Sequence, residues 1–316
     1  MEKRQLGNSD LHVSPITFGG NVLGWTIDEQ QSFTVLDAFV SNGFNFIDTA
    51  DVYSRWVPGH VGGESETILG NWMKARSNRE KVVIATKVGS DMGEGKTLKK
   101  AYILKRVEDS LKRLQTDYID LYQTHFDDET TPVEETLEAY SELVKAGKVR
   151  WVGASNMSAA RLTASLKASA EHGFPKYQSF QPEYNLYARE GFEKEHEQIC
   201  LDNNLGVIGY FSLASGFLTG KYRSNADFGK SIRGGGMAKY LNERGNKILA
   251  ALDKISAEQN TSLASIALAW LIARPSVTAP IASATKVEQV EEFVKAVNLH
   301  LSKEDIDLLN AASTWK

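Results

Sequence analysis

The amino-acid sequence predicts an α/β protein folded as a (β/α)8 barrel, with an N-terminal β-hairpin and extra helices at the C-terminus. Eight short apolar segments, each suited in length to a buried strand, alternate with longer segments of helical periodicity. Most of them recur at intervals of roughly 30 to 40 residues, as expected for such a barrel. A doubly wound Rossmann sheet is the alternative, and it is disfavoured because no Gly-x-Gly-x-x-Gly motif follows a predicted strand.

The elements follow one another in a regular order. Two short strand-like pieces, 3–6 and 11–13, flank turn-forming residues and predict the hairpin. The eight barrel strands are expected at 15–20, 44–48, 82–87, 118–125, 149–153, 178–181, 206–210 and 278–281. Helices are expected at 28–41, 62–73, 97–114, 132–146, 158–170, 189–203, 241–260, 263–273, 287–297 and 303–311. No low-complexity segment divides the chain, so residues 1–316 are predicted to form a single domain.

Composition narrows the class of protein. The 316 residues are 42% hydrophobic and 24% charged, with a formal net charge of −4, which argues against nucleic acid or an anionic membrane as the main partner. The single cysteine, Cys200, excludes an intramolecular disulfide and fits a reducing compartment. The N-terminal residues show no signal-peptide pattern, and no apolar run approaches the length of a membrane helix. We therefore expect a cytoplasmic protein, and we predict no metal site.

Titratable residues end three consecutive predicted strands. Asp48 closes the second strand and is followed five residues later by Tyr53, Lys87 closes the third and His125 closes the fourth. The carboxyl ends of barrel strands meet at one mouth, where catalytic residues lie. Each residue alone has an ordinary structural explanation, but their joint arrival at one mouth favours a catalytic site.

The chemistry of this set suits the reduction of a carbonyl group. A phenol with a pKa of about 10 is a poor proton donor at neutral pH. We expect the ammonium of Lys87 to lower the pKa of Tyr53, and Asp48 to keep Lys87 charged. His125 can form a hydrogen bond with the same oxygen that Tyr53 protonates, while hydride arrives at carbon.

The Asp-Thr-Ala-x-x-Tyr motif at 48–53, followed by Lys87 and His125, resembles the catalytic tetrad of the aldo-keto reductase family in order and context. The resemblance covers essentially the whole chain. Within the family, the chain is similar in type to bacterial members that resemble potassium-channel β-subunits. It implies that Tyr53 is the general acid, that Lys87 and Asp48 tune it, and that His125 orients the carbonyl. It also implies that hydride comes from NADPH held without a Rossmann fold.

The same resemblance implies a cofactor site. Ser155, Asn156 and Gln181 would hold the nicotinamide carboxamide, and Tyr210 would stack on the nicotinamide ring. The loop 213–221 would cover the pyrophosphate, and the segment 281–289 would bind the adenosine 2′-phosphate. The expected cofactor-binding residues are Gly20, Asp48, Ser155, Asn156, Gln181, Tyr210, Leu213, Ser215, Gly216, Lys221, Ser283, Thr285, Lys286 and Gln289.

Three positions depart from the family pattern. Lys286 stands where the family often has arginine, and lysine cannot make a bidentate phosphate contact. Ser212 stands where the family often has proline. Phe293 replaces an asparagine that commonly faces adenine, so the amide hydrogen bonds of that asparagine are lost.

The substrate is expected to be a small-molecule aldehyde or ketone. Trp25, Trp56 and Phe126 follow strands one, two and four and would wall an apolar carbonyl pocket, although plain packing of the loops explains them equally well. The glycine-rich segment 227–239 is a candidate to fold over bound cofactor.

Two other functions compete with carbonyl reduction. One is an NADP(H)-binding regulatory or redox-sensing subunit with little turnover, which would keep the same tetrad. The other is a barrel aldolase with Lys87 as a Schiff-base lysine, and the pairing with Asp48 disfavours it because such a lysine must lose its proton to attack.

Overall fold

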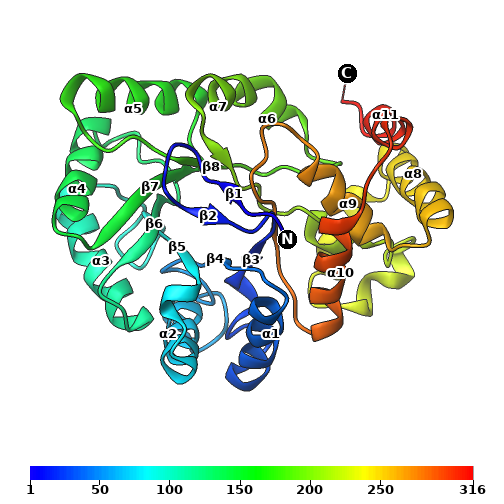
Figure 1. Ribbon diagram of the computed structural model, residues 1–316, viewed down its shortest axis with the longest axis horizontal. Coiled ribbons are helices and arrows are strands. Elements are labelled where there is room, and N and C mark those ends of the chain that lie inside the picture. The colour runs from blue at the N-terminus through cyan, green and yellow to red at the C-terminus, as the bar shows by residue number, and fades with distance from the viewer. Residues whose placement is uncertain (316) are drawn as a thin grey trace.

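The computed structural model describes residues 1–315 and is an α/β fold in which helices surround a curled parallel sheet (Figure 1). The strands are β1 (Arg4–Gln5), β2 (His12–Val13), β3 (Thr17–Gly19), β4 (Phe46–Asp48), β5 (Val83–Val88), β6 (Ile119–Thr124), β7 (Val149–Ser155), β8 (Ser179–Gln181), β9 (Gly206–Val207) and β10 (Ile281–Ala282). The helices are α1 (Glu29–Ser41), α2 (Glu64–Arg76), α3 (Lys100–Leu114), α4 (Val133–Lys145), α5 (Ala159–His172), α6 (Glu190–Glu195), α7 (Glu197–Asn203), α8 (Glu243–Gln259), α9 (Leu263–Ile272), α10 (Val287–Asn298) and α11 (Lys303–Ala312). Among the described helices, none is both long and apolar enough to cross a lipid bilayer.

Eight parallel strands pair in the order β10-β3-β4-β5-β6-β7-β8-β9. The two ends of this order are also joined, since Thr278 N–H donates to Val207 O at 2.9 Å and Ile281 N–H donates to Gly209 O at 2.8 Å. This arrangement confirms the predicted α/β class and is consistent with the predicted (β/α)8 barrel. The predicted N-terminal hairpin is also present, as antiparallel β1 and β2.

The hairpin closes the end of the sheet that lies opposite the strands' carboxyl ends. Leu6, Leu11 and Val13 are buried and pack against inward-facing strand residues. These are Phe46, Val83, Ala85 and Leu121, together with Ile208 and Ala279, which lie beside the ends of β9 and β10. A separate, larger apolar layer lies between the sheet and the helices. The period of two along each strand therefore sends alternate side chains to an inner and an outer layer.

Short polar side chains fix the helix starts. Asp28 accepts a hydrogen bond from Gln31 N at 2.8 Å and begins α1. Ser302 and Asp305 form a reciprocal capping box at the start of α11, which packs against α8. Ser158, Asn242 and Ser262 cap α5, α8 and α9 in the same way as Asp28 caps α1.

Three predicted elements differ from the structure. The helix expected at 189–203 breaks into α6 and α7 at His196, whose ring stacks on Phe180 at 4.7 Å and whose Nε2 lies 2.9 Å from Met157 O. The strand expected at 278–281 is β10, Ile281–Ala282, because Pro280 has no N–H for the ladder. The strand expected at 206–210 ends at Val207.

The glycine-rich loop that follows β9 is not structureless. It contains the 3₁₀ helices η3 (Ala214–Thr219), η4 (Asn225–Lys230) and η5 (Gly234–Tyr240). Two further 3₁₀ helices, η1 (Gly20–Val22) and η2 (Arg79–Lys81), occur elsewhere. Short 3₁₀ turns satisfy some backbone groups without a long helical pattern, which explains why periodicity did not predict them.

A substitution at Gly70 would test the close packing of α2 on the end of α3. A Cβ at Gly70 would lie 2.2 Å from Arg113 O, a backbone atom that cannot yield as a side chain does. We expect Gly70→Ala to lower the free energy of unfolding by about 1–3 kcal/mol, measured by urea denaturation. Gly191→Ala in α6 is the control, because a Cβ at Gly191 would meet no other atom within 4 Å. Equal stability of the two variants would contradict this packing.

Candidate active site

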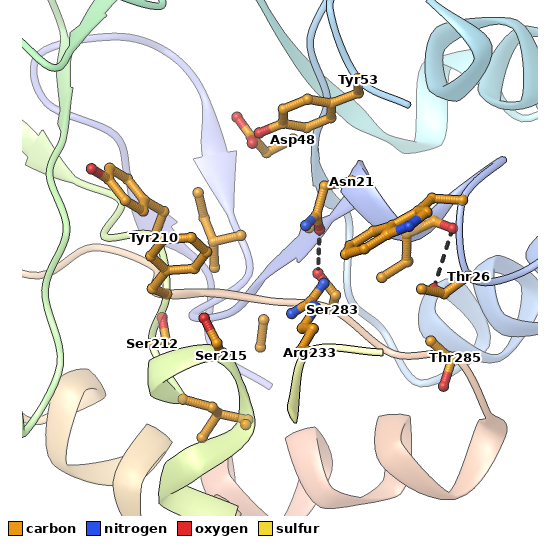
Figure 2. A pocket seen from close by; sticks show the side chains of 18 of the residues that line it. Asn21, Thr26, Asp48, Tyr53, Tyr210, Ser212, Ser215, Arg233, Ser283 and Thr285 are labelled. Carbon is orange, nitrogen blue, oxygen red and sulfur yellow. Dashed lines mark hydrogen bonds between the residues drawn. The ribbon is translucent and has the colours of Figure 1, made fainter. Parts of the chain in front are cut away.

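A cavity of about 840 Å³ opens at the carboxyl ends of the strands (Figure 2). Most of the residues expected at the site line it: Trp25, Asp48, Tyr53, Trp56, His125, Phe126, Ser155, Asn156, Gln181, Tyr210, Leu213, Ser215, Gly216, Lys221, Ser283, Thr285 and Gln289. Gly20, Lys87 and Lys286 are not part of its lining. Lys87 lies directly behind the lining, in contact with Tyr53.

Lys87 is fully buried and donates to three oxygens. Its Nζ lies 2.6 Å from Asp48 Oδ2, 2.8 Å from Thr49 O and 2.8 Å from Tyr53 Oη. These contacts use the three N–H bonds of the ammonium group. The ammonium therefore links the carboxylate to the phenol.

The second oxygen of Asp48 is also occupied. Gln123 Nε2 donates to Asp48 Oδ1 at 3.1 Å, and Gln181 Nε2 donates to the same oxygen at 3.0 Å. Gln123 of β6 lies two residues before His125, so both face inward. The buried carboxylate thus has partners on both oxygens, as a buried charge requires.

The pKa values of the phenol and the ammonium are both raised. Burial raises the pKa of Tyr53, although the ammonium of Lys87 acts to lower it. The ammonium therefore acts in the expected direction, but burial outweighs it and the pKa of Tyr53 is raised. For Lys87, burial acts to lower the pKa, but Asp48 and Tyr53 more than offset this. At neutral pH Tyr53 therefore keeps its proton and Lys87 its charge.

His125 is buried beside the phenol. Its ring lies 5.9 Å from the ring of Tyr53 and stacks on Phe126 at 4.7 Å. Burial holds the pKa of His125 well below its ordinary value, and the charges of Lys87 and Lys96 act in the same direction. The imidazole is therefore neutral at pH 7 and keeps one N–H to donate.

A second cluster of polar side chains lies across the cavity. Its residues come from the ends of β7 and β8 and from the turn after β9. Tyr210 Oη donates to Asn156 Oδ1 at 2.9 Å, and Asn156 Nδ2 donates to His125 O at 2.9 Å. Ser155 Oγ donates to Gln181 O at 2.8 Å. The residues expected to hold a nicotinamide are thus joined to one another and to the backbone of His125.

The far end of the cavity holds the segment after β10. Ser283 Oγ donates to Asn21 Oδ1 at 2.8 Å, a contact that Figure 2 shows as a dashed line. Thr285 N–H donates to Gln289 Oε1 at 2.7 Å. Lys286 is exposed at the start of α10, outside the cavity lining.

The other two departures from the family pattern are structurally explained. Phe293 is buried and packs edge-on against Phe44, with ring centroids 6.4 Å apart, so it belongs to the core. Ser212 is buried and donates to Gly209 O at 3.1 Å, which supplies a local contact that proline could not make.

Sequence reasoning missed several lining residues. Arg233 reaches the cavity from the segment between η4 and η5, with its guanidinium 5.1 Å from the centre of a Trp25 ring. Asn21 follows the glycines that end β3, and Phe211 follows Tyr210. A lone arginine in the glycine-rich segment was the available signal for Arg233, and the path of that segment was not predictable.

The aromatic residues expected at the substrate pocket lie together. The Trp25 and Trp56 rings meet edge to face at 5.5 Å, and Trp56 lies 6.0 Å from the ring of Tyr53. Trp56 is 48% exposed and Phe211 44% exposed, so the rim beside the phenol is apolar and open. Within residues 1–315, no group of three or more His, Cys, Asp or Glu side chains could hold a metal ion.

A family model described as the aldo/keto reductase family matches residues 15–314, which is nearly the whole chain. The chain belongs to the aldo/keto reductase family. This confirms the predicted resemblance, and family membership supports oxidoreductase activity on carbonyl compounds.

Curated relatives of this aldo/keto reductase agree with the family assignment. The uncharacterized oxidoreductase YrpG of Bacillus subtilis is 36% identical, over 98% of this chain and 95% of its own. An aryl-alcohol dehydrogenase [NADP(+)] of Phanerodontia chrysosporium is 31% identical, over 95% and 82%. A probable voltage-gated potassium channel subunit beta of Arabidopsis thaliana is also 31% identical, over 95% and 92%.

The buried ion pair of Lys87 and Asp48 can be tested through stability. Lys87→Met leaves the carboxylate of Asp48 buried without a counter-charge, so we expect the free energy of unfolding to fall by about 3–5 kcal/mol. Lys105→Met, which breaks an exposed pair with Glu94, is the control and should change it by less than about 1 kcal/mol. Similar losses in the two variants, measured by urea denaturation, would show that burial of the Lys87–Asp48 pair does not constrain the fold.

The lowered pKa of His125 predicts a pH dependence of stability. The unfolded chain binds a proton at this histidine below about pH 6.5, whereas the folded chain resists it. The free energy of unfolding should therefore fall on acidification from pH 6.5, by up to about 1.4 kcal/mol per pH unit. His125→Gln should remove this part of the slope, and His300→Gln at an exposed site should not. An unchanged slope in His125→Gln argues against a neutral buried imidazole.

Proposed function

We propose that this chain is an NADPH-dependent reductase that converts aldehydes or ketones to alcohols, with Tyr53 as the general acid. The observation that carries the proposal is the contact of 2.8 Å between Lys87 Nζ and Tyr53 Oη beside an open cavity. We propose that the curled sheet is a closed (β/α)8 barrel and that residues 1–316 form one domain. The cytoplasmic location expected from the sequence stays a prediction.

The residues of the cavity fit NADPH. Arg233 is partly buried, and burial lowers its pKa, yet within the described residues it makes no salt bridge with a carboxylate. Such a cation favours an anionic ligand, and a phosphate group is one. Ser215 and Gly216 both have left-handed backbones, with φ of 56° and 100°, a geometry in which successive amides can approach phosphate oxygens.

We assign the nicotinamide end to Asn156, Gln181 and Tyr210, and the adenosine end to Ser283, Thr285 and Gln289. Arg233 would supply the cationic phosphate contact that Lys286 cannot make in bidentate form. When bound, NADPH supplies the hydride that reaches the carbonyl carbon.

The chain's own residues would handle the proton. Tyr53 donates its proton to the carbonyl oxygen, and the adjacent ammonium of Lys87 stabilises the phenolate that remains. Asp48 keeps Lys87 charged and fixed in place. The neutral imidazole of His125 donates a hydrogen bond to the same carbonyl oxygen and so orients it.

The apolar rim indicates the kind of carbonyl compound. Trp25, Trp56 and Phe126 present aromatic surface near the phenol, so we propose neutral aromatic aldehydes among the substrates. The aryl-alcohol dehydrogenase [NADP(+)] among the relatives supports both this choice and NADPH.

The second candidate function is an NADP(H)-binding regulatory or redox-sensing subunit with little turnover. The relative named as a probable potassium channel subunit beta favours it. Assays of NADPH oxidation and NADPH binding with the purified protein should distinguish the two functions. Oxidation of NADPH by a panel of aldehydes, ketones and dicarbonyls supports the enzyme, and tight NADPH binding without turnover supports the subunit.

Tyr53→Phe tests the general acid. Removal of the phenolic O–H should lower kcat for 4-nitrobenzaldehyde at least about 100-fold, because positioned general acids contribute about 10²–10⁴. NADPH binding, followed by fluorescence, should change little. Tyr118→Phe is the control, since the guanidinium of Arg79 covers the ring of Tyr118 and this tyrosine does not line the cavity. Wild-type turnover in Tyr53→Phe would remove the assigned role.

A further inference from the structure

A buried polar cluster lies behind the catalytic residues, between the sheet and helices α2 and α3. Asp51 is fully buried in the turn between Asp48 and Tyr53, and its nearest cation is Arg106 of α3, with Nε 3.6 Å from Oδ2. Tyr122 of β6 is also buried and faces this outer layer. Asp51, Arg106 and Tyr122 do not line the cavity and take no part in the chemistry described above.

The cluster holds polar atoms without a protein partner. Nε and Nη2 of Arg106 and Oη of Tyr122 are buried without a hydrogen-bond partner, and the carboxylate of Asp51 has no well-formed hydrogen bond, with the backbone N–H of Val52 as its nearest donor. Buried polar atoms are rarely left unpaired, and ordered water commonly satisfies groups of them. Water can accept from Arg106, donate to Asp51 and bond Tyr122 in either sense.

We propose that Asp51, Arg106 and Tyr122 form a buried hydrated site, and that Asp51, through the turn 49–53, acts as a positioning residue for Tyr53. This inference rests on the proposed function of Tyr53 as the general acid.

The backbone explains how Asp51 reaches the phenol. Asp51 N–H donates to Lys87 O at 3.4 Å, and Tyr53 N–H donates to Ala50 O at 3.2 Å. The turn 49–53 is therefore attached at Asp51 to the residue whose ammonium contacts the phenol. The pairing of Asp51 with Arg106 adds a side-chain anchor from this turn to α3.

The charges around Asp51 make this anchor sensitive to protonation. Burial, and then the carboxylate of Glu66 on α2, raise the pKa of Asp51 to about 7, against Arg106 and Arg113 of α3. Glu66 is itself held by Arg113 Nε at 2.7 Å and by Thr86 of β5. The other groups facing the cluster are Tyr102 and Asp109 of α3 and Tyr122 of β6.

The folded chain binds a proton at Asp51 more tightly than the unfolded chain, whose carboxyl has a pKa of about 3.8. The free energy of unfolding that Asp51 contributes is therefore greatest at low pH and is lost as pH rises from about 4 to 7. This sign is opposite to that of His125. Asp51→Asn should remove this loss, a readout that needs no turnover.

Kinetics of Asp51→Asn test the positioning role. We expect kcat for 4-nitrobenzaldehyde to fall about 10- to 100-fold, because small misplacements of a reacting group are costly, while KM and NADPH affinity stay within about twofold. Asp120→Asn is the matched control, a buried carboxylate paired with Arg79 and Arg150 near the opposite end of β6. It should lower stability without changing kcat. A kcat loss no larger than that of the control would overturn the positioning role.

A second variant covers the case in which Asp51→Asn does not fold, since it removes the carboxylate beside Arg106 Nε and leaves Asp109 as the one carboxylate that pairs with Arg106 among the described residues. Asp51→Asn/Arg106→Met removes both charges and should fold with the same loss of kcat. Wild-type kcat in the folded double variant would count against the proposal.

Crystal structures of the wild type and of the folded variant decide the remaining points independently of activity. We expect an ordered water within hydrogen-bond distance of Asp51 in the wild type, and its absence overturns the hydrated site. We expect Tyr53 Oη to move away from Lys87 Nζ in the variant, and an unchanged separation of 2.8 Å overturns the positioning role. If wild-type protein turns over no carbonyl, the proposed function fails, but these structures still decide the inference.

Discussion

The ammonium of Lys87 and the carboxylate of Asp48 lie 2.6 Å apart where solvent does not reach, and the geometry of the site follows from satisfying them. Two buried charges are tolerated only when each remaining hydrogen-bonding position is filled. Thr49 O and Tyr53 Oη fill those of the lysine, and two glutamine amides fill those of the carboxylate. The position of the phenol therefore follows from the hydrogen bonds that the ion pair requires. Strands β4, β5, β6 and β8 supply the ion pair and its two glutamine partners.

The alternation of side chains along parallel strands explains why polar residues gather in two layers. On β5, Lys87 faces inward to Asp48, whereas Thr86 faces outward and donates to Glu66 of α2. On β6, Gln123 faces inward and Tyr122 outward. One short stretch of each strand therefore serves both the inner site and the outer cluster of Asp51, which couples their positions through the backbone.

Much of the inner site could be predicted from the sequence because a strand end fixes where a side chain points. Asp48, Lys87 and His125 each end a predicted strand, so the parallel order of the strands places them at one mouth. Arg233 was not predictable, since its place depends on the path of a loop with no periodic signal. The contacts of Asp51 were also hidden, because Arg106 is distant from it in sequence. The raised pKa of Tyr53 was hidden as well, because it depends on burial, which the sequence does not give.

The N-terminal hairpin closes the interior of the sheet at the end opposite the cavity. Leu6, Leu11 and Val13 pack with Phe46 and Leu121 in the inner layer. These side chains form an apolar plug between the ion pair and the hairpin end of the sheet. Protons do not travel through packed hydrocarbon. Under the proposed function, the phenol of Tyr53 therefore regains its proton through the same opening that admits the reactants.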